Sequence, residues 1–225
     1  MYIHKATFAS MIQIHPFTFN PFQENTYLLS DETNECVIID PGCYTEDEKQ
    51  ELSAFISSRG LKPVKLLLTH AHIDHVLGNN YLCGKYNLMI EMNVIEKELL
   101  KSAELFGEMW GIKVEPSPAP EVFLDEGDEV RFGNSTLQII FTPGHSPGSI
   151  CFYNPAGKFI IAGDVLFHGS IGRTDLPGGD YDTLIGSIRE KVFPLGDEFK
   201  VFPGHGPSTT IEYEKKFNPF VGENA

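Results

Sequence analysis

The feature that most constrains this chain is a polar cluster that directly follows a short apolar run. The run at 64–68 predicts a buried strand. Within the next seven residues the chain places three histidines and one aspartate, at His70, His72, Asp74 and His75. Imidazole and carboxylate groups are the usual ligands of zinc and related divalent metals. Because ligand sites in layered α/β folds lie at the carboxyl ends of strands, the sequence predicts a metal site at this turn.

The second half of the chain repeats this arrangement three times. Apolar runs at 137–141, 159–162 and 199–202 are each followed by glycine and by one potential metal ligand. These potential ligands are His145, Asp164 and His205. Any one of these residues alone is best explained as a turn or capping residue. Together, the seven candidates exceed the four ligands of a closed zinc site and the three protein ligands of a mononuclear catalytic site. They fit two adjacent metals that share a bridging group, about 3.5–4 Å apart.

The remaining predicted elements indicate a layered α/β fold. Strands are expected at 12–19, 26–29, 36–39 and 88–90. Helices are expected at 45–60, 76–86, 93–106 and 180–193, and a last one begins near Thr209; the patterns Thr45-x-x-Glu48, Asn93-x-x-Glu96 and Thr209-x-x-Glu212 mark three of the starts. This order suggests two sheets packed face to face with helices outside, in four layers.

The segment 107–120 is rich in glycine and proline, so a surface loop is expected there. This loop is a candidate border of the metal site. Its apolar candidates for that role are Phe106, Met109 and Trp110.

Length and composition predict a single domain over 1–225. The chain has 225 residues, of which 41% are hydrophobic, which suffices for one core. Residues 1–10 are expected to form a frayed N-terminal extension, with Met11 as an alternative start. The net charge of −14 argues against nucleic acid or an anionic membrane surface as a partner. No apolar run is long enough to span a bilayer, and the oligomeric state is left open.

Four scattered cysteines bear on the compartment. They lack C-x-x-C spacing, which argues against a cysteine-rich structural zinc site; they are Cys36, Cys43, Cys83 and Cys151. We expect buried thiols in a reducing compartment. Because the N-terminus also lacks the apolar core of a secretory signal, the sequence predicts a cytoplasmic protein.

Four motifs together resemble the metallo-β-lactamase superfamily. They are Thr69–His75 with Gly78, Pro143–Gly148, Gly163–Asp164 and Pro203–Gly206. The similarity runs from about residue 11 to about residue 220, and it implies the αββα sandwich of that superfamily. Carried over residue by residue, the resemblance implies that the first metal is held by His70, His72 and His145. It implies that the second is held by Asp74, His75 and His205, and that Asp164 bridges the two.

Within the superfamily, three segments resemble short glyoxalase II-like hydrolases: Gly163–Phe167, Gly172–Asp175 and Pro203–Pro207. This resemblance implies hydrolysis of S-2-hydroxyacylglutathione thioesters such as S-lactoylglutathione. Only two basic residues, Lys215 and Lys216, follow His205, whereas full-length glyoxalase II enzymes bind glutathione with basic residues of a C-terminal helical domain. The thiol part of the substrate therefore stays open.

The expected chemistry is hydrolysis of a small-molecule thioester by a hydroxide that bridges two divalent metals. Zinc is expected from the ligand types, and the same ligands accept iron or manganese. Two metals lower the pKa of a shared water, so hydroxide is available near neutral pH. Asp74 is the candidate catalytic residue, which would orient this nucleophile and accept its proton. A thioester suits the site because a thiolate, with a thiol pKa of about 8.5, departs without strong acid help.

Alternatives remain at this stage. Arg173 is the candidate substrate-binding residue, but an ion pair with Asp175 that shapes its loop explains it equally well. His168 lies in the same region and is more readily explained as structural.

Two other enzyme classes also fit the sequence. A sulfur dioxygenase with one iron would need only two histidines and one aspartate, which His70, His145 and Asp164 could supply. An ester or lactone is also compatible with the chemistry, so a lactonase or β-lactamase is the third alternative.

Overall fold

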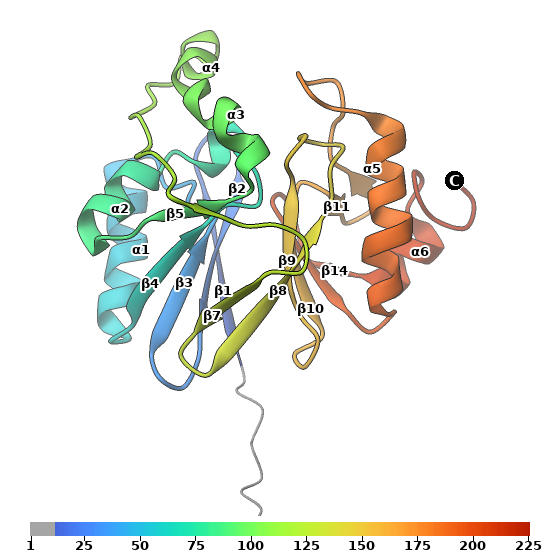
Figure 1. Cartoon of the computed structure of the whole chain (residues 1–225), viewed down its shortest axis with the longest axis horizontal. Helices are drawn as coiled ribbons and strands as arrows, with labels where there is room; N and C mark the ends of the chain where they lie inside the picture. Colours follow the sequence, from blue (N-terminus) through green and yellow to red (C-terminus); the bar gives the residue numbers. More distant parts are fainter. Residues whose placement is uncertain (1–11) are drawn as a thin grey trace, which may run out of the picture.

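The computed structural model describes residues 12–225, which form two six-stranded sheets packed face to face with helices on their outer sides (Figure 1). The predicted four-layer αββα sandwich is therefore confirmed. The expected N-terminal extension at 1–10 and the alternative start at Met11 lie outside the described residues. Within residues 12–225, none of the helices combines the length and the apolar character needed to cross a membrane.

The first sheet contains six strands in the order of the sequence. They are β1 (Gln13–Phe19), β2 (Glu24–Ser30), β3 (Glu35–Ile39), β4 (Lys62–Leu67), β5 (Ile90–Met92) and β6 (Val122–Phe123). The first three are antiparallel neighbours, whereas β3 to β6 pair in parallel. Parallel pairs need crossover connections. The helices α1 (Glu46–Ser58) and α2 (Asn79–Tyr86) supply two of them on the outer face.

The second sheet has the order β14-β13-β10-β9-β8-β7. Its strands are β7 (Glu129–Phe132), β8 (Ser135–Phe141), β9 (Ile150–Asn154), β10 (Phe159–Gly163), β13 (Lys200–Pro203) and β14 (Thr209–Thr210). The helices α5 (Tyr181–Ser187) and α6 (Ile211–Phe217) lie on the opposite side of the molecule from α1 and α2 (Figure 1). A separate two-stranded sheet pairs β11 (Leu166–Phe167) with β12 (Ser170–Ile171).

Alternation along the strands divides the apolar side chains between two cores. In β3, Cys36 and Ile38 pack with residues of α1 and α2, whereas Val37 and Ile39 face the other sheet. The same alternation on the second sheet serves the central core and the core under α5 and α6. All four cysteines are buried as free thiols, as expected. The apolar core between the two sheets thus fixes their relative position. A site can form where the edges of the two sheets meet.

Several predicted boundaries in the first half are wrong for local reasons. The helix expected from residue 76 begins at Asn79, because residues 73–75 form a 3-10 turn first. Asn87 adopts a left-handed conformation after α2, so the strand expected at 88–90 is displaced to 90–92. The expected helix at 93–106 is divided into a 3-10 turn, α3 (Lys97–Lys101) and α4 (Ala103–Trp110).

The loop expected over 107–120 is also partly wrong. Helix α4 continues to Trp110, and Gly111 ends it with a φ of 69°. In the second half, α5 covers 181–187 of the predicted helix and a π-helical turn covers 188–192. Thr210 caps the last helix instead of Thr209, whose hydroxyl hydrogen-bonds Glu214. The capping box at Thr45 and Glu48 is confirmed.

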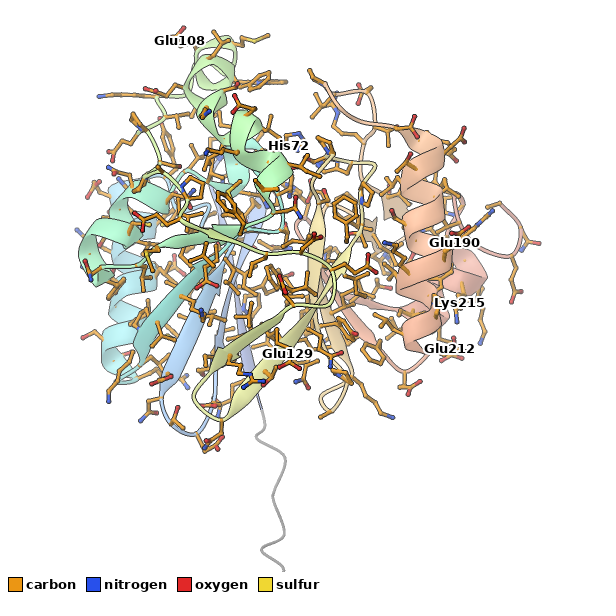
Figure 2. The ribbon with its side chains drawn as sticks, viewed as in Figure 1. His72, Glu108, Glu129, Glu190, Glu212 and Lys215 are labelled. Carbon is orange, nitrogen blue, oxygen red and sulfur yellow. The ribbon has the colours of Figure 1, made fainter. Side chains whose placement is uncertain are left out.

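The strand directions bring the predicted ligands to one edge. Strands β3, β4, β8, β10 and β13 all end there, because β8 and β10 are both antiparallel to β9. Backbone hydrogen bonds tie the two sheets together at this edge. Ile150 N donates to Thr69 O at 2.9 Å, and Asn25 N donates to Gly204 O at 2.7 Å. His72 lies at this upper end of the sandwich, between its two halves (Figure 2).

Candidate metal centre

Three histidine side chains converge from two sheets. His70 and His72 follow β4, and His145 follows β8. The Nε2 atom of His145 lies 3.2 Å from His70 Nε2 and 2.8 Å from His72 Nδ1. Nitrogens bound to one tetrahedral zinc at about 2.0–2.1 Å would lie about 3.3 Å from one another. The three rings are therefore arranged like the ligands of a single metal ion.

A second group lies directly beside the first. Asp74 Oδ2 is 3.0 Å from His205 Nε2 and 3.6 Å from His75 Nε2. Asp164 faces both groups, because its Oδ2 is 3.5 Å from His145 Nε2 and 3.5 Å from His205 Nε2. Its Oδ1 is 3.4 Å from His75 Nε2. The structure thus brings together all seven residues that the sequence singled out, with Asp164 between the two groups.

The nitrogens on the far side of four rings lie close to oxygen atoms. His70 Nδ1 lies 3.0 Å from Thr69 Oγ1, and His75 Nδ1 lies 3.2 Å from Asp40 Oδ2. His145 Nδ1 lies 2.7 Å from the Arg173 carbonyl, and His205 Nδ1 lies 3.2 Å from the Phe22 carbonyl. Such partners fix the ring orientation and leave the inner nitrogen free to bind a metal.

The buried polar atoms at the centre fit a cation. His75 Nε2 and Asp164 Oδ1 are buried, and neither has a hydrogen-bond partner among residues 12–225. An unpaired buried polar atom destabilises a fold by roughly 1–3 kcal/mol, so such atoms normally have a function. A divalent cation bound between the two groups would satisfy both of them.

Asp40 belongs to a third group of potential ligands with His70 and His75, whose atoms lie within 4.8 Å of one another. Its carboxylate already accepts the Thr69 N–H at 2.7 Å and the Thr69 hydroxyl at 2.6 Å. Asp40 therefore lies behind the His75 ring, where its carboxylate is 3.2 Å from His75 Nδ1 and interacts with it by charge. Asp40 follows strand β3 directly, so it too lies at a strand end on this edge of the sheet.

Electrostatics differ between the two groups. Burial holds the pKa of His70 well below its ordinary value and lowers the pKa of His72 to about 3. Both rings are therefore neutral near neutral pH and keep a lone pair for a metal. Burial also lowers the pKa of His75, but the carboxylates of Asp74 and Asp164 outweigh it and raise that pKa well above the ordinary value. The carboxylates of Asp74 and Asp164 thus favour a positive charge at His75, which is the position that a bound cation would take.

Glycine beside the ligands makes this density of side chains sterically feasible. A Cβ at Gly204 would overlap Asp164 Oδ1 and would lie 2.8 Å from His75 Cε1. Gly163 has a φ of 49°, and a Cβ there would overlap the Thr69 hydroxyl. The glycines next to the ligands in the sequence are therefore required by close approach, in addition to their turn geometry.

Glu96 connects the two halves of the site. This fully buried residue ends the 3-10 turn after β5. Its Oε2 accepts the Ala71 N–H at 2.9 Å, and its Oε1 accepts the Gly148 N–H at 2.6 Å together with the Ser146 hydroxyl. Ala71 lies between His70 and His72, and Ser146 follows His145. One carboxylate therefore sets the separation of the histidines that come from different sheets.

The predicted role of Glu96 in a helix cap is therefore wrong. Asn93 does cap this turn, because its side chain accepts the Ile95 N–H at 3.0 Å. The Glu96 N–H donates to the Asn93 carbonyl at 3.2 Å, but the Glu96 carboxylate accepts from groups about fifty residues away in the sequence and not from the Asn93 backbone. No local pattern marks such a contact.

An apolar cavity of about 480 Å³ opens over the candidate metal ligands. Five of the seven candidates line it, namely His72, Asp74, His145, Asp164 and His205. Phe106 and Trp110 line it as expected, but Met109 is 74% exposed and does not. Arg173 lines the cavity too, and its guanidinium forms a two-point ion pair with Asp175 at 2.7 Å. Its role in substrate binding stays a prediction.

The sequence of residues 19–205 matches the family described as the metallo-β-lactamase superfamily. The chain belongs to the metallo-β-lactamase superfamily. The resemblance given by the sequence motifs is thereby confirmed, and so is the fold that it implied.

Relatives within this superfamily include a probable metallo-hydrolase, YqgX of Bacillus subtilis. It is 41% identical over 204 residues, which cover 89% of this chain and 93% of the relative. Hydroxyacylglutathione hydrolase GloC of Haemophilus influenzae is 38% identical over 216 residues, which cover 95% of this chain and 99% of GloC. The chain thus spans almost the full length of both relatives.

Solved structures of the superfamily agree with the fold. BLEG-1 B3 metallo-β-lactamase is 33% identical with a TM-score of 0.86, covering 93% of this chain and 99% of its own. TTHA1623, solved in a di-iron-bound form, is 40% identical with a TM-score of 0.83, covering 92% and 99%. ETHE1 from Myxococcus xanthus is 28% identical with a TM-score of 0.77, covering 95% and 86%.

Proposed function

We propose that the protein is a dinuclear metal-dependent hydrolase that cleaves small thioesters, with glyoxalase II-like activity on substrates such as S-lactoylglutathione. The observation that carries this proposal is the convergence of seven metal-ligand side chains from two sheets at the base of one apolar cavity. The similarity to GloC over 95% of the chain supports the thioester class.

Each residue has a defined part in this proposal. His70, His72 and His145 would hold one ion, Asp74, His75 and His205 the other, and Asp164 would lie between them. Divalent metals bound there would polarise the acyl carbonyl and lower the pKa of water to near neutral. The ligand types favour zinc, and iron and manganese are compatible with the same atoms.

The chain's own groups would then position water and the acyl group. Asp74 Oδ2 lies at the cavity, 3.0 Å from His205 Nε2, where it can accept a proton from the attacking water and orient it. Hydrolysis breaks the acyl C–S bond, the water oxygen stays on the acyl carbon, and the thiolate leaves. The apolar lining above the site provides a surface for the non-reacting part of the substrate.

The mononuclear sulfur dioxygenase is less well supported. That reaction needs only His70, His145 and Asp164, but His72 lies 2.8 Å from His145 and points to the same position. Asp74, His75 and His205 form a further group of ligands that a single iron would leave unused. A lactonase or β-lactamase would use the same seven residues, and substrate panels separate these from a thioesterase.

The test is thiol release from S-lactoylglutathione and from an uncharged thioester by zinc-loaded protein. Asp74→Asn should lower kcat by about 100-fold or more, within the range of general-base catalysis. Asp182→Asn provides the control, because Asp182 is an exposed carboxylate on α5 that does not line the cavity. Oxygen uptake with glutathione persulfide by a protein that holds one iron and releases no thiol from either thioester would refute the proposal.

A further inference from the structure

The walls of the cavity are strongly apolar. Nine of its sixteen lining residues are apolar: Phe22, Ile73, Leu99, Phe106, Trp110, Phe167, Ile171, Leu176 and Pro177. Polar groups gather at the base, where the metal-ligand residues lie. In ligand pockets of this size, apolar walls usually contact most of the bound molecule, and a few polar groups fix its orientation. A ligand that fills this cavity would place polar atoms at the base and apolar atoms against the walls.

One wall is aromatic and belongs to α4 and the β1–β2 turn. Phe22 packs edge-on against Trp110, with ring centroids 6.0 Å apart, and Phe106 lines the cavity from the same helix. The backbone of Phe22 also holds His205, whose Nδ1 lies 3.2 Å from the Phe22 carbonyl. The aromatic wall, defined as Phe22, Phe106 and Trp110, is thus directly connected to the metal-ligand residues.

Helix α4, which carries Phe106 and Trp110 of the aromatic wall, packs closely on neighbouring segments. At Gly107 of α4, an added Cβ would lie 2.5 Å from Val114 Cγ2 and 2.6 Å from the Ile112 carbonyl. The same Cβ would lie 3.5 Å from Ile73 Cδ1, beside the histidine turn. Gly107 therefore lets the helix pack closely on the site. Trp110 remains 60% exposed, so its ring has apolar surface available for a ligand.

Positive charge in the cavity is already paired. Arg173 is the one lysine or arginine among the lining residues, and its Nε and one terminal nitrogen both donate to Asp175 at 2.7 Å. The chain as a whole carries a net charge of −14. An anionic group bound over the metal-ligand residues would thus find no unpaired cationic side chain among the residues that line the cavity.

We propose that the cavity selects thioesters that carry an uncharged apolar group, which packs on the aromatic wall. This inference rests on the proposed thioester hydrolysis. The inference extends the proposed function, because it assigns specificity to apolar contact with Phe22, Phe106 and Trp110. It does not assign specificity to charge recognition of a thiol such as glutathione. Each methylene group that packs on the wall is removed from water, and this burial favours binding of the substrate.

The first experiment measures kcat/KM for acyl thioesters of uncharged N-acetylcysteamine with zinc-loaded protein. Between the acetyl and hexanoyl thioesters, kcat/KM should rise about fourfold for each added methylene, and kcat/KM for the hexanoyl thioester should exceed that for S-lactoylglutathione. Trp110→Ala should lower kcat/KM for the hexanoyl thioester about tenfold and for the acetyl thioester much less. Met109→Ala is the matched control, since Met109 lies on the same helix and outside the cavity.

The second experiment measures binding without turnover. Trp110 is the single tryptophan of the chain, so its fluorescence reports on the aromatic wall directly. Two thioethers that cannot be hydrolysed serve as probes: S-hexyl-N-acetylcysteamine, which is uncharged, and S-hexylglutathione, which is anionic. The uncharged probe should shift Trp110 emission and bind at least as tightly as the anionic one. Phe22→Ala should weaken its binding about tenfold, whereas Leu105→Ala should not.

The outcomes separate this inference from the proposed function. Thioester hydrolysis that favours S-lactoylglutathione and falls in Arg173→Met, but not in Trp110→Ala, would overturn the inference and leave the function standing. Binding of the uncharged thioether at the aromatic wall without hydrolysis of any thioester would overturn the function and support apolar selection. Absence of any fluorescence change with both probes would overturn the inference.

Discussion

Replacing Glu96 with glutamine tests how the two sheets are joined at the site. Glutamine keeps the size of the side chain but exchanges one carboxylate oxygen for an N–H donor. With its oxygen facing Ser146 and Gly148, the new amide group must face the Ala71 N–H, so that two donors oppose each other. The bond that anchors the histidine turn is then lost.

The size of the effect follows from that one contact. A hydrogen bond to a charged group contributes roughly 1.5–3 kcal/mol. This range corresponds to roughly 10- to 150-fold in an equilibrium constant. Because metal binding requires the turn at His70 and His72 to meet the loop at His145, we expect E96Q to bind its first zinc about 10- to 100-fold more weakly, as found for groups that orient ligands elsewhere.

The assay is competition for zinc with a chromophoric chelator, alongside urea unfolding of the metal-free protein. E98Q is the matched control, because Glu98 is exposed in the same segment and its carboxylate forms an ion pair with Lys101 at 2.6 Å, away from the site. Unchanged zinc affinity in E96Q, together with reduced stability of its metal-free form, would refute the positioning role and leave Glu96 a structural residue.

Three further outcomes are expected. His72→Ala should lower the rate of thioester hydrolysis by about 100-fold or more and reduce the zinc content, because it removes one of three converging nitrogens. Full activity in kinetic assays, with unchanged zinc content in elemental analysis, would contradict the ligand assignment. Chelator treatment should abolish activity and lower Tm, since a ligand at about 100 times its Kd stabilises a fold by about 2.7 kcal/mol; an unchanged Tm after complete metal removal would contradict it. Burial raises the pKa of Asp31, but hydrogen bonds from Thr33, Asn134 and Ser135 outweigh it and lower that pKa, so Asp31→Asn should destabilise the fold by about 1–3 kcal/mol near neutral pH. That difference should shrink in urea unfolding as pH falls below about 4 and through the lowered pKa, because only the ionised carboxylate favours the folded state; a difference independent of pH would show that the charge has no part.

The fold was predictable where local pattern and tertiary structure agree. Alternating apolar residues in strands such as 36–39 assign each side chain to one core, and the capping box at Thr45 fixes the start of α1. The seven ligand candidates were predictable because each lies in a loop that begins at the end of a strand. Parallel strand directions then carry that local signal into a common site.

The remainder depends on contacts that are distant in the sequence. Glu96 looks like a helix-start residue until the loop at Ser146 and Gly148 is placed beside it. The extent of α4 depends on the close approach of Gly107 to Val114, which overrides the loop-forming tendency of glycine. The sequence allowed an ion pair between Arg173 and Asp175 as one of two explanations of Arg173. Only the structure shows that this ion pair forms and that Arg173 lines the cavity.

The most direct test of the central claim is anomalous diffraction from crystals of metal-loaded protein, recorded on either side of the absorption edge of zinc. The account predicts two peaks, one against His70, His72 and His145 and the other against Asp74, His75 and His205, with Asp164 in contact with both. A single peak, or peaks away from these side chains, would contradict it.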